Sequence, residues 1–310
     1  MYKIAFILIT FLVSQISQAQ EVGTEEIQLF NDHIELPGTL SYPKTSEKIP
    51  LVIFIHGSGN VDRNGNQAGV NINAAYIQQL ADSLNTENIA FYRYDKRTAT
   101  VSNLEKSTNV TLDDFVEDAE VAIDHFKGDK RFSEIVLIGH SQGSLIAMLV
   151  AQKGTVSKYI SLNGPGNKIS ETIIEQIGDY PELVTKAREH FDELEKTDTI
   201  VQVHPFLMNI FVPQNQKFLK NWNSYSPTLE IAKLKIPVLI IQGEADLQVG
   251  LEDAKMLQAA QPKAQLVLVT KMNHVLKTVE NPNENQQSYY NSEFPLSSQL
   301  VDTISEFIKQ

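Results

Sequence analysis

The residues with the clearest chemical meaning in this sequence are Gly139-His140-Ser141-Gln142-Gly143, which follow an apolar run directly. A strand that enters a G-x-S-x-G pattern predicts a sharp turn into a helix, with the hydroxyl of Ser141 lifted out of the sheet. The two glycines suit such a turn, because neighbouring segments pass too close to the backbone for a Cβ atom. The mostly apolar residues 144–153 predict the helix, whose N-terminus directs partial positive charge toward the serine. The pattern therefore predicts an exposed serine that can act as a nucleophile.

A serine hydroxyl is a weak nucleophile at neutral pH and needs two partners. An imidazole must accept its proton, and a carboxylate must hold that imidazole in the correct tautomer. Asp246 follows the predicted strand 238–242, and His274 follows the predicted strand 265–269. Both residues therefore lie in loops at the carboxyl ends of strands, as Ser141 does. Ser141, Asp246 and His274 are the predicted catalytic triad for acyl transfer.

Alternatives to Asp246 and His274 exist in the sequence. Glu244 lies nearer its strand than Asp246 does, and Asp253 falls within the next helical pattern. His56 precedes the serine in the chain, and His140 adjoins it with a side chain expected to point elsewhere. The remaining histidines are expected to be structural (His204) or at the surface (His33, His125 and His190).

Attack on a carbonyl creates an oxyanion, which needs hydrogen-bond donors. The first predicted donor is the backbone N–H of Gln142, directly after the nucleophile. The second comes from the loop after the predicted strand 51–55, where His56-Gly57-Ser58-Gly59 follows. We assign Ser58 to this role, with Gly57 and Gly59 as alternatives. This chemistry implies no metal and no organic cofactor.

The elements that must position these residues follow the pattern of an α/β protein. Short apolar runs separated by helix-length segments are typical of a mostly parallel central sheet flanked by helices. A polar segment, 25–42, predicts an antiparallel hairpin before the sheet. The predicted strands are 51–55, 89–92, 135–138, 158–162, 238–242 and 265–269, and the predicted helices are 73–85, 112–127, 144–153, 251–260 and 297–309.

The alternation of strands and helices stops between residues 164 and 227. Helical patterns follow one another there, over 169–177, 181–194 and 214–222. An insertion at this point would lie above the carboxyl ends of the strands, where ligands bind in open α/β sheets. We therefore expect a helical cap over the site. Its apolar residues are expected to pack the cap rather than to contact substrate: Phe206, Leu207, Met208, Phe211 and Trp222.

Length and composition fit one large domain, and the N-terminal pattern predicts export. The chain has 310 residues and 42% hydrophobic content, which favours a single α/β domain over 20–310. Lys3, an apolar run of about ten residues and a small-x-small pattern at Ser17-Gln18-Ala19 predict a signal peptide over 1–19. That run spans only about half of a bilayer core, so no membrane anchor is expected after cleavage, and the location is periplasmic or extracellular.

The absence of cysteine and the negative net charge limit the covalent links and the partners that this protein can have. The chain contains no cysteine, which excludes disulfides and a bacterial lipoprotein attachment. Loss of Lys3 with the signal peptide changes the formal net charge from -12 to -13. So acidic a surface disfavours nucleic acid and anionic membranes as partners.

Several segments together resemble a known superfamily. HGSGNVDRNGN, FYRYDKR, GHSQG, PVLIIQGEAD and MNH, in that order, are similar to α/β-hydrolases, particularly bacterial esterases and serine aminopeptidase-like members with a helical cap. The resemblance covers nearly all of the mature chain and implies the nucleophile, acid, base order of Ser141, Asp246 and His274. One departure occurs after Arg97, where Thr98-Ala-Thr-Val-Ser102 lacks the glycines usual in these families. The loop there is expected to have a different shape.

Three functions are compatible with the sequence. The first is a carboxylesterase acting on a small-molecule acyl ester through an acyl-enzyme. The second is an aminopeptidase-like enzyme, which needs carboxylates near the site for the substrate's ammonium group, and Glu182, Glu189 and Glu193 are the candidates. The third is a hydrolase-fold binding protein without activity, which would normally lack one triad member. The complete triad argues against the third, and the carboxylesterase is the leading prediction.

Overall fold

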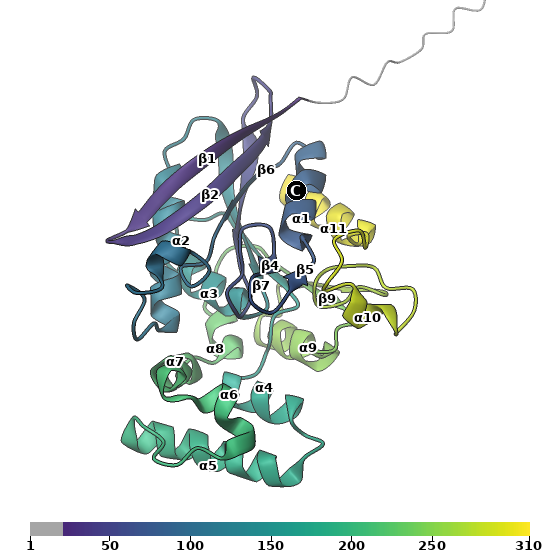
Figure 1. Ribbon diagram of the computed structural model, residues 1–310. Coiled ribbons are helices and arrows are strands. Elements are labelled where there is room, and N and C mark those ends of the chain that lie inside the picture. The colour runs from purple at the N-terminus through teal and green to yellow at the C-terminus, as the bar shows by residue number, and fades with distance from the viewer. Residues whose placement is uncertain (1–20) are drawn as a thin grey trace, which may run out of the picture.

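A central eight-stranded sheet with helices on both faces forms the body of the protein (Figure 1). The computed structural model describes residues 21–310, so the predicted signal peptide lies outside the described residues. The strand order is β1-β2-β6-β3-β7-β8-β9-β10. β1 pairs antiparallel with β2 and β2 with β6, whereas all the other neighbours are parallel. The predicted fold, a mostly parallel sheet flanked by helices as in α/β-hydrolases, is confirmed.

All six predicted sheet strands and the leading hairpin are present. The sheet strands are β1 Val22–Asn31, β2 Ile34–Pro43, β3 Ile49–Ile55, β6 Ala90–Tyr94, β7 Phe132–His140, β8 Lys158–Leu162, β9 Val238–Gly243 and β10 Gln265–Val269. A separate small hairpin consists of β4 Asn66–Gln67 and β5 Ile72–Asn73.

Alternate residues of β3 show why its sequence is apolar throughout. Leu51, Ile53 and Ile55 belong to the core beneath α2 and α3, while Val52 and Phe54 belong to the core beneath α1 and α11. All five side chains are buried. A strand covered on both faces needs apolar residues at every position, because neither face meets water.

Helices outside the insertion agree with the predicted segments to within three residues at either end. They are α1 Tyr76–Thr86, α2 Leu112–Phe126, α3 Gln142–Ala151, α9 Leu251–Ala260 and α11 Ser298–Lys309, with a short α10 Glu284–Gln287 and the 3-10 turn η1 Val101–Asn103. α3 begins two residues before the predicted start, since the turn at Ser141 reverses the chain at one residue. α1 begins three residues late, because Ile72–Asn73 pairs in β5 and Ala75 is left-handed at φ 48°.

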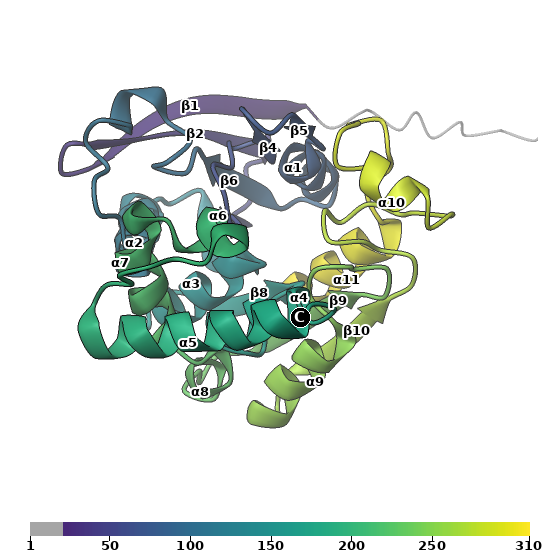
Figure 2. The same cartoon turned by 60° about the horizontal axis from the view of Figure 1, so that its bottom comes forward.

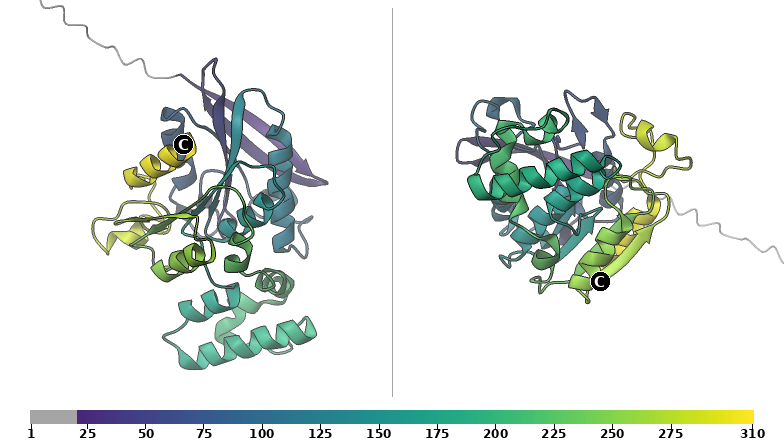
Figure 3. Two further views of the ribbon diagram at one scale, coloured as in Figure 1. Left: turned by 180° about the vertical axis from the view of Figure 1, so that it is seen from behind. Right: turned by 90° about the horizontal axis from the view of Figure 1, so that it is seen from below.

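The helical insertion, residues 164–227, connects β8 to β9 and contains most of a group of helices at one end of the molecule (Figures 1 and 3). Figure 2 shows α5 running across this end, with α6 and α7 beside it. Among residues 21–310, no helix has the length and apolar character needed to cross a membrane. The bounds are α4 Ile169–Gln176, α5 Pro181–Thr197, η2 Pro205–Leu207, α6 Met208–Phe211, α7 Pro213–Asn223 and, at the return to the sheet, α8 Pro227–Ile231.

His190 was expected at the surface, and that expectation is wrong. Its side chain is buried on the same face of α5 as Ala187, Phe191 and Leu194. Its Nε2 accepts a hydrogen bond from the backbone N–H of His204 at 3.0 Å, and its ring meets the edge of Phe211. Helical periodicity rather than residue type decides its position.

The apolar residues expected to pack the insertion divide into three groups. Leu207 and Phe211 are buried as expected. Phe206 is 82% exposed and Met208 is 42% exposed, because the short η2 and α6 turn only part of their surface toward the core. Trp222 is buried, but it also lines two cavities, so its expected role is incomplete.

Candidate active site

Ser141 sits at a strained turn between β7 and α3. Its backbone has φ 52° and ψ -123°, a conformation that is costly for a residue with a Cβ atom. The turn is held by its N–H, which donates to the Leu162 carbonyl oxygen at 3.0 Å. A Cβ on Gly139 would lie 2.4 Å from the Gly143 carbonyl oxygen, and one on Gly143 would lie 2.2 Å from that of Ile55. Both glycines are therefore sterically required, as the sequence predicts.

Asp246 and His274 meet at the carboxyl ends of β9 and β10. Nδ1 of His274 lies 2.8 Å from Oδ2 of Asp246 and donates to it. The other carboxylate oxygen accepts the backbone N–H groups of Gln248 at 2.7 Å and Val249 at 3.1 Å. Burial alone would raise the pKa of Asp246, but His274 and these N–H groups outweigh it and lower the pKa below 3.8. The carboxylate is thus held ionised and fixed behind the imidazole.

Ser141 and His274 line one cavity of about 280 Å³. The insertion contributes part of its wall through Ile169, Thr172 and Trp222. We call this space the serine cavity. Among residues 21–310 no hydrogen bond joins the Ser141 hydroxyl to His274; contacts of this kind often tighten only when substrate binds.

The two alternative acids do not contact His274. Asp253 lies in the first turn of α9, and its carboxylate accepts hydrogen bonds from the backbone N–H groups of Gly166 at 2.8 Å and Gly250 at 3.2 Å. Glu244 is exposed to solvent. The structure thus pairs Asp246, rather than either alternative, with the imidazole.

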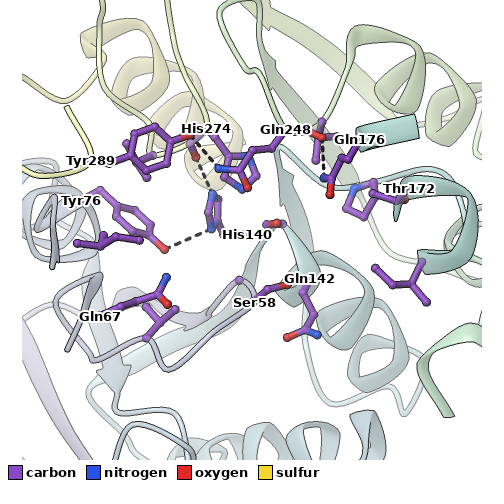
Figure 4. A pocket seen from close by; sticks show the side chains of 18 of the residues that line it. Ser58, Gln67, Tyr76, His140, Gln142, Thr172, Gln176, Gln248, His274 and Tyr289 are labelled. Carbon is purple, nitrogen blue, oxygen red and sulfur yellow. Dashed lines mark hydrogen bonds between the residues drawn. The ribbon is translucent and has the colours of Figure 1, made fainter. Parts of the chain in front are cut away.

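The histidines nearest the serine are both engaged elsewhere. Nε2 of His56 donates to the Tyr94 carbonyl oxygen, and burial together with the charge of Lys96 lowers the pKa of His56 to about 4. His140 lines the serine cavity, where its Nε2 donates to the His274 carbonyl oxygen at 2.8 Å and its Nδ1 accepts from the Tyr76 hydroxyl at 3.3 Å (Figure 4). Burial and the neighbouring His274 lower the pKa of His140 to about 3. Both rings are therefore neutral and hold other groups in place.

The predicted oxyanion donors lie beside the nucleophile. Ser58 and Gln142 both line the serine cavity, and Gln142 is the first residue of α3. Helix N-terminal N–H groups have no partner within the helix, so the Gln142 N–H can serve a ligand. A Cβ on Gly57 would lie 3.1 Å from the Ser141 Cβ, which shows how closely this loop approaches the serine. Gly59, an alternative donor, lines a neighbouring cavity instead.

Two polar residues of the site escaped the sequence analysis. Asn163 directly follows β8 and is fully buried, with hydrogen bonds to the last residue of β9 and to the loop that carries His274. Lys96 lies two residues after the end of β6. It contacts Gly57 in the loop after β3 and Gln142 at the start of α3. Their positions at strand ends were a usable signal, since Asp246 and His274 were found by that rule. Within the described chain, no group of three or more acidic, histidine or cysteine side chains is arranged to hold a metal ion.

Comparisons with known proteins agree with the fold described above. The family model for serine aminopeptidase, S33, matches residues 68–193, which include Ser141. Esterase EstD of Thermotoga maritima is 23% identical over 278 residues, which is 88% of this chain but only 65% of that relative's length. Among solved structures, Est1E from Butyrivibrio proteoclasticus has a TM-score of 0.59 at 17% identity, covering 92% of this chain and 99% of its own. Proline iminopeptidase of Mycobacterium smegmatis has a TM-score of 0.59 at 12% identity, covering 92% and 98%.

Proposed function

We propose that this chain, which has the α/β-hydrolase fold, is a serine carboxylesterase that cleaves small acyl esters through an acyl-enzyme on Ser141. The observation that carries the proposal is the pairing of His274 Nδ1 with the buried carboxylate of Asp246 at 2.8 Å, at a cavity that Ser141 also lines. The esterase relative supports the same class of reaction.

The proposed reaction uses each group in one role. His274 Nε2 accepts the proton of the Ser141 hydroxyl as the oxygen attacks the ester carbonyl carbon. The backbone N–H groups of Ser58 and Gln142 donate to the oxyanion, and each such donor contributes about 3 to 4 kcal/mol to the lowering of the barrier. His274 then gives the proton to the leaving alcohol. Water attacks the acyl-enzyme by the same route, releasing the carboxylic acid and restoring Ser141.

The lining of the serine cavity supports an ester rather than a peptide with a free amino terminus. An aminopeptidase needs a carboxylate to hold the substrate's ammonium group. No Asp or Glu is among the described residues that line the cavity. Glu182, Glu189 and Glu193 all lie on α5, which contributes no residue to the lining. The polar groups that do line it are uncharged, including Gln67, Thr172 and Gln248 (Figure 4).

The proposed place of action is outside the cytoplasm. The support for export is the signal-peptide pattern over residues 1–19. Expression of the full chain, followed by sequencing of the mature N-terminus, tests this proposal. Cleavage after Ala19 is the expected result, and recovery of an uncleaved cytoplasmic chain contradicts it.

The test of activity compares wild type with Ser141→Ala on short-chain 4-nitrophenyl esters and on aminoacyl 4-nitroanilides. Loss of the nucleophile is expected to lower kcat on the esters by up to about a million-fold. Faster turnover of the anilides than of the esters would favour the peptidase. Equal rates for the two proteins, or failure of an organophosphonate to label folded wild type at Ser141, would favour the inactive binding protein.

A further inference from the structure

Lys96 is a buried cation that contacts both segments of the predicted oxyanion site. Its residue is only 4% exposed, two positions after the end of β6. Its Nζ donates to the Gly57 carbonyl oxygen at 2.8 Å and to Oε1 of Gln142 at 2.8 Å. One side chain thus joins the loop after β3 to the first residue of α3.

The third direction around the ammonium is occupied by an aromatic ring. Nζ lies 4.4 Å from the centre of Phe115 on α2. No carboxylate forms an ion pair with Lys96 in the described part of the chain. Asp118, the acidic group whose charge acts on Lys96, is bound by Arg97 at 2.7 Å, and the neighbouring His56 is neutral. Burying an ammonium group without an ionic partner is costly, so a purely space-filling role is a poor account of this lysine.

The hydrogen bond to Gly57 acts on the peptide that carries the Ser58 N–H. Gly57 C=O and Ser58 N–H belong to one trans peptide, so they point in opposite directions. A donor that holds the carbonyl oxygen from one side therefore fixes where the N–H points on the other. An ammonium on that oxygen also polarises the peptide and makes the N–H a stronger donor.

We propose that Lys96 is the positioning residue of the oxyanion site, aiming the Ser58 N–H through the Gly57 carbonyl and fixing α3 through the Gln142 side chain. The proposal rests on the proposed function, because it concerns the same oxyanion. It also selects Ser58 over Gly57 and Gly59 as the second donor. The positive charge of Lys96, which contacts both segments that carry these donors, stabilises the negative charge that develops on the oxyanion.

The role requires the charged form, which gives a pH readout. Burial lowers the pKa of Lys96 to about 7, against a smaller opposing effect of Asp118. The ammonium is therefore present below this pKa and is lost as the pH rises through it. Wild-type kcat is expected to fall on the alkaline side for this reason, after the background hydrolysis measured with Ser141→Ala is subtracted.

The experiment measures kcat and KM on a short-chain 4-nitrophenyl ester between about pH 6 and about pH 9. Lys96→Met keeps the volume but removes the donors, and is expected to lower kcat at pH 6 by about tenfold to a hundredfold, with KM changed by less than about threefold. Its alkaline fall in kcat disappears. Lys96→Arg keeps a charge that does not titrate, and is expected to recover part of kcat without an alkaline fall.

Lys277→Met is the matched control. Lys277 is also fully buried, and burial lowers its pKa to about 8, but its Nζ donates to Gln79 and to the Phe294 carbonyl oxygen rather than to the oxyanion segments. Its replacement is expected to leave the alkaline fall in kcat at the wild-type pH.

The outcomes separate this inference from the proposed function. Active wild type with unchanged kcat and pH profile in folded Lys96→Met overturns the role of Lys96 and leaves the esterase proposal intact. If Lys96→Met does not fold, the wild-type profile decides, and a kcat that stays flat to about pH 9 overturns the inference. Inactive wild type overturns both proposals.

Discussion

The buried side chain of Asn163 donates from Nδ2 to the backbone carbonyl oxygen of Asn273 at 3.0 Å. Its Nδ2 also reaches the His274 carbonyl oxygen at 3.3 Å, and its Oδ1 accepts the N–H of Gly243 at 2.8 Å. One amide thus links the end of β8 to the last residue of β9 and to the loop after β10. The geometry of the pair Asp246 and His274 depends on these segments keeping their separation.

Asn163→Gly is predicted to lower both stability and activity. Asn163 has φ 48°, a left-handed conformation that glycine adopts without strain, so this change isolates the loss of the amide. The change leaves three buried backbone groups without the hydrogen bond that Asn163 provides. This loss is expected to lower the free energy of unfolding by about 2 to 4 kcal/mol, as measured by urea denaturation. kcat should fall with it. A variant with wild-type stability and kcat would show that the loops hold their positions without Asn163.

Asp246→Asn is predicted to reduce kcat by about ten-thousand-fold, because an amide no longer fixes the imidazole tautomer that accepts the serine proton. The two rival acids serve as controls. Glu244→Gln should keep wild-type kcat. Asp253→Asn should lose about 1 to 2 kcal/mol of stability through its bond to Gly166 and retain most of kcat. Loss of kcat in Glu244→Gln, with activity retained in Asp246→Asn, would move the acid to the other position.

The Asp246 carboxylate is also expected to make the free energy of unfolding depend on pH in the acid range. The pKa of Asp246 is lower in the folded protein than its ordinary value of 3.8, so its ionised form stabilises the fold. That contribution is complete above pH 3.8 and is lost as the pH falls through the lower folded-state pKa. The difference in unfolding free energy between wild type and Asp246→Asn is expected to shrink as the pH falls from 3.8 to about 2. A difference that stays constant over this range contradicts the assigned pKa direction.

The elements and the positions of Ser141, Asp246 and His274 at strand ends were accessible from the sequence because they depend on local patterns. A strand buried on both faces is apolar throughout, as in Leu51 to Ile55, and a residue just past a strand's carboxyl end lies at the sheet edge where sites form. That reasoning placed Asp246 and His274 correctly at neighbouring strand ends.

The residues that support the site depend on contacts between distant parts of the chain. Lys96 meets Gln142 across 46 positions, and Asn163 meets Asn273 across 110. No local sequence pattern indicates contacts between residues so far apart in the chain. His190 was misplaced for a different reason, because its polar type was given more weight than the helical spacing that puts it on one face with Phe191 and Leu194. Side-chain hydrogen bonds, rather than hydrophobic periodicity, decide the positions of Lys96 and Asn163.

Gly139→Ala is predicted to destabilise the protein by about 3 kcal/mol or more, because its Cβ would lie 2.4 Å from a backbone oxygen that cannot move without disturbing α3. Gly128→Ala is the matched control. A Cβ there meets nothing within 4 Å, and the change is expected to be neutral or stabilising by up to about 1 kcal/mol. Thermal unfolding of both variants checks the contrast, which would be absent if the turn at Ser141 were more open than described.

Trp222 is predicted to limit the length of the acyl chain. It lines the serine cavity and a second cavity of about 710 Å³, so its indole stands where the two spaces meet. Trp222→Leu should join them and raise kcat/KM for an octanoyl ester relative to an acetyl ester by about fivefold to tenfold, since each methylene placed in an apolar pocket is worth about 1 kcal/mol or more. Phe206→Leu is the control, because Phe206 lies in the same insertion but is 82% exposed and lines neither cavity. An unchanged ratio in folded Trp222→Leu would mean that the acyl chain lies away from the indole. An equal rise of the ratio in Phe206→Leu would mean that the preference comes from looser packing of the insertion as a whole.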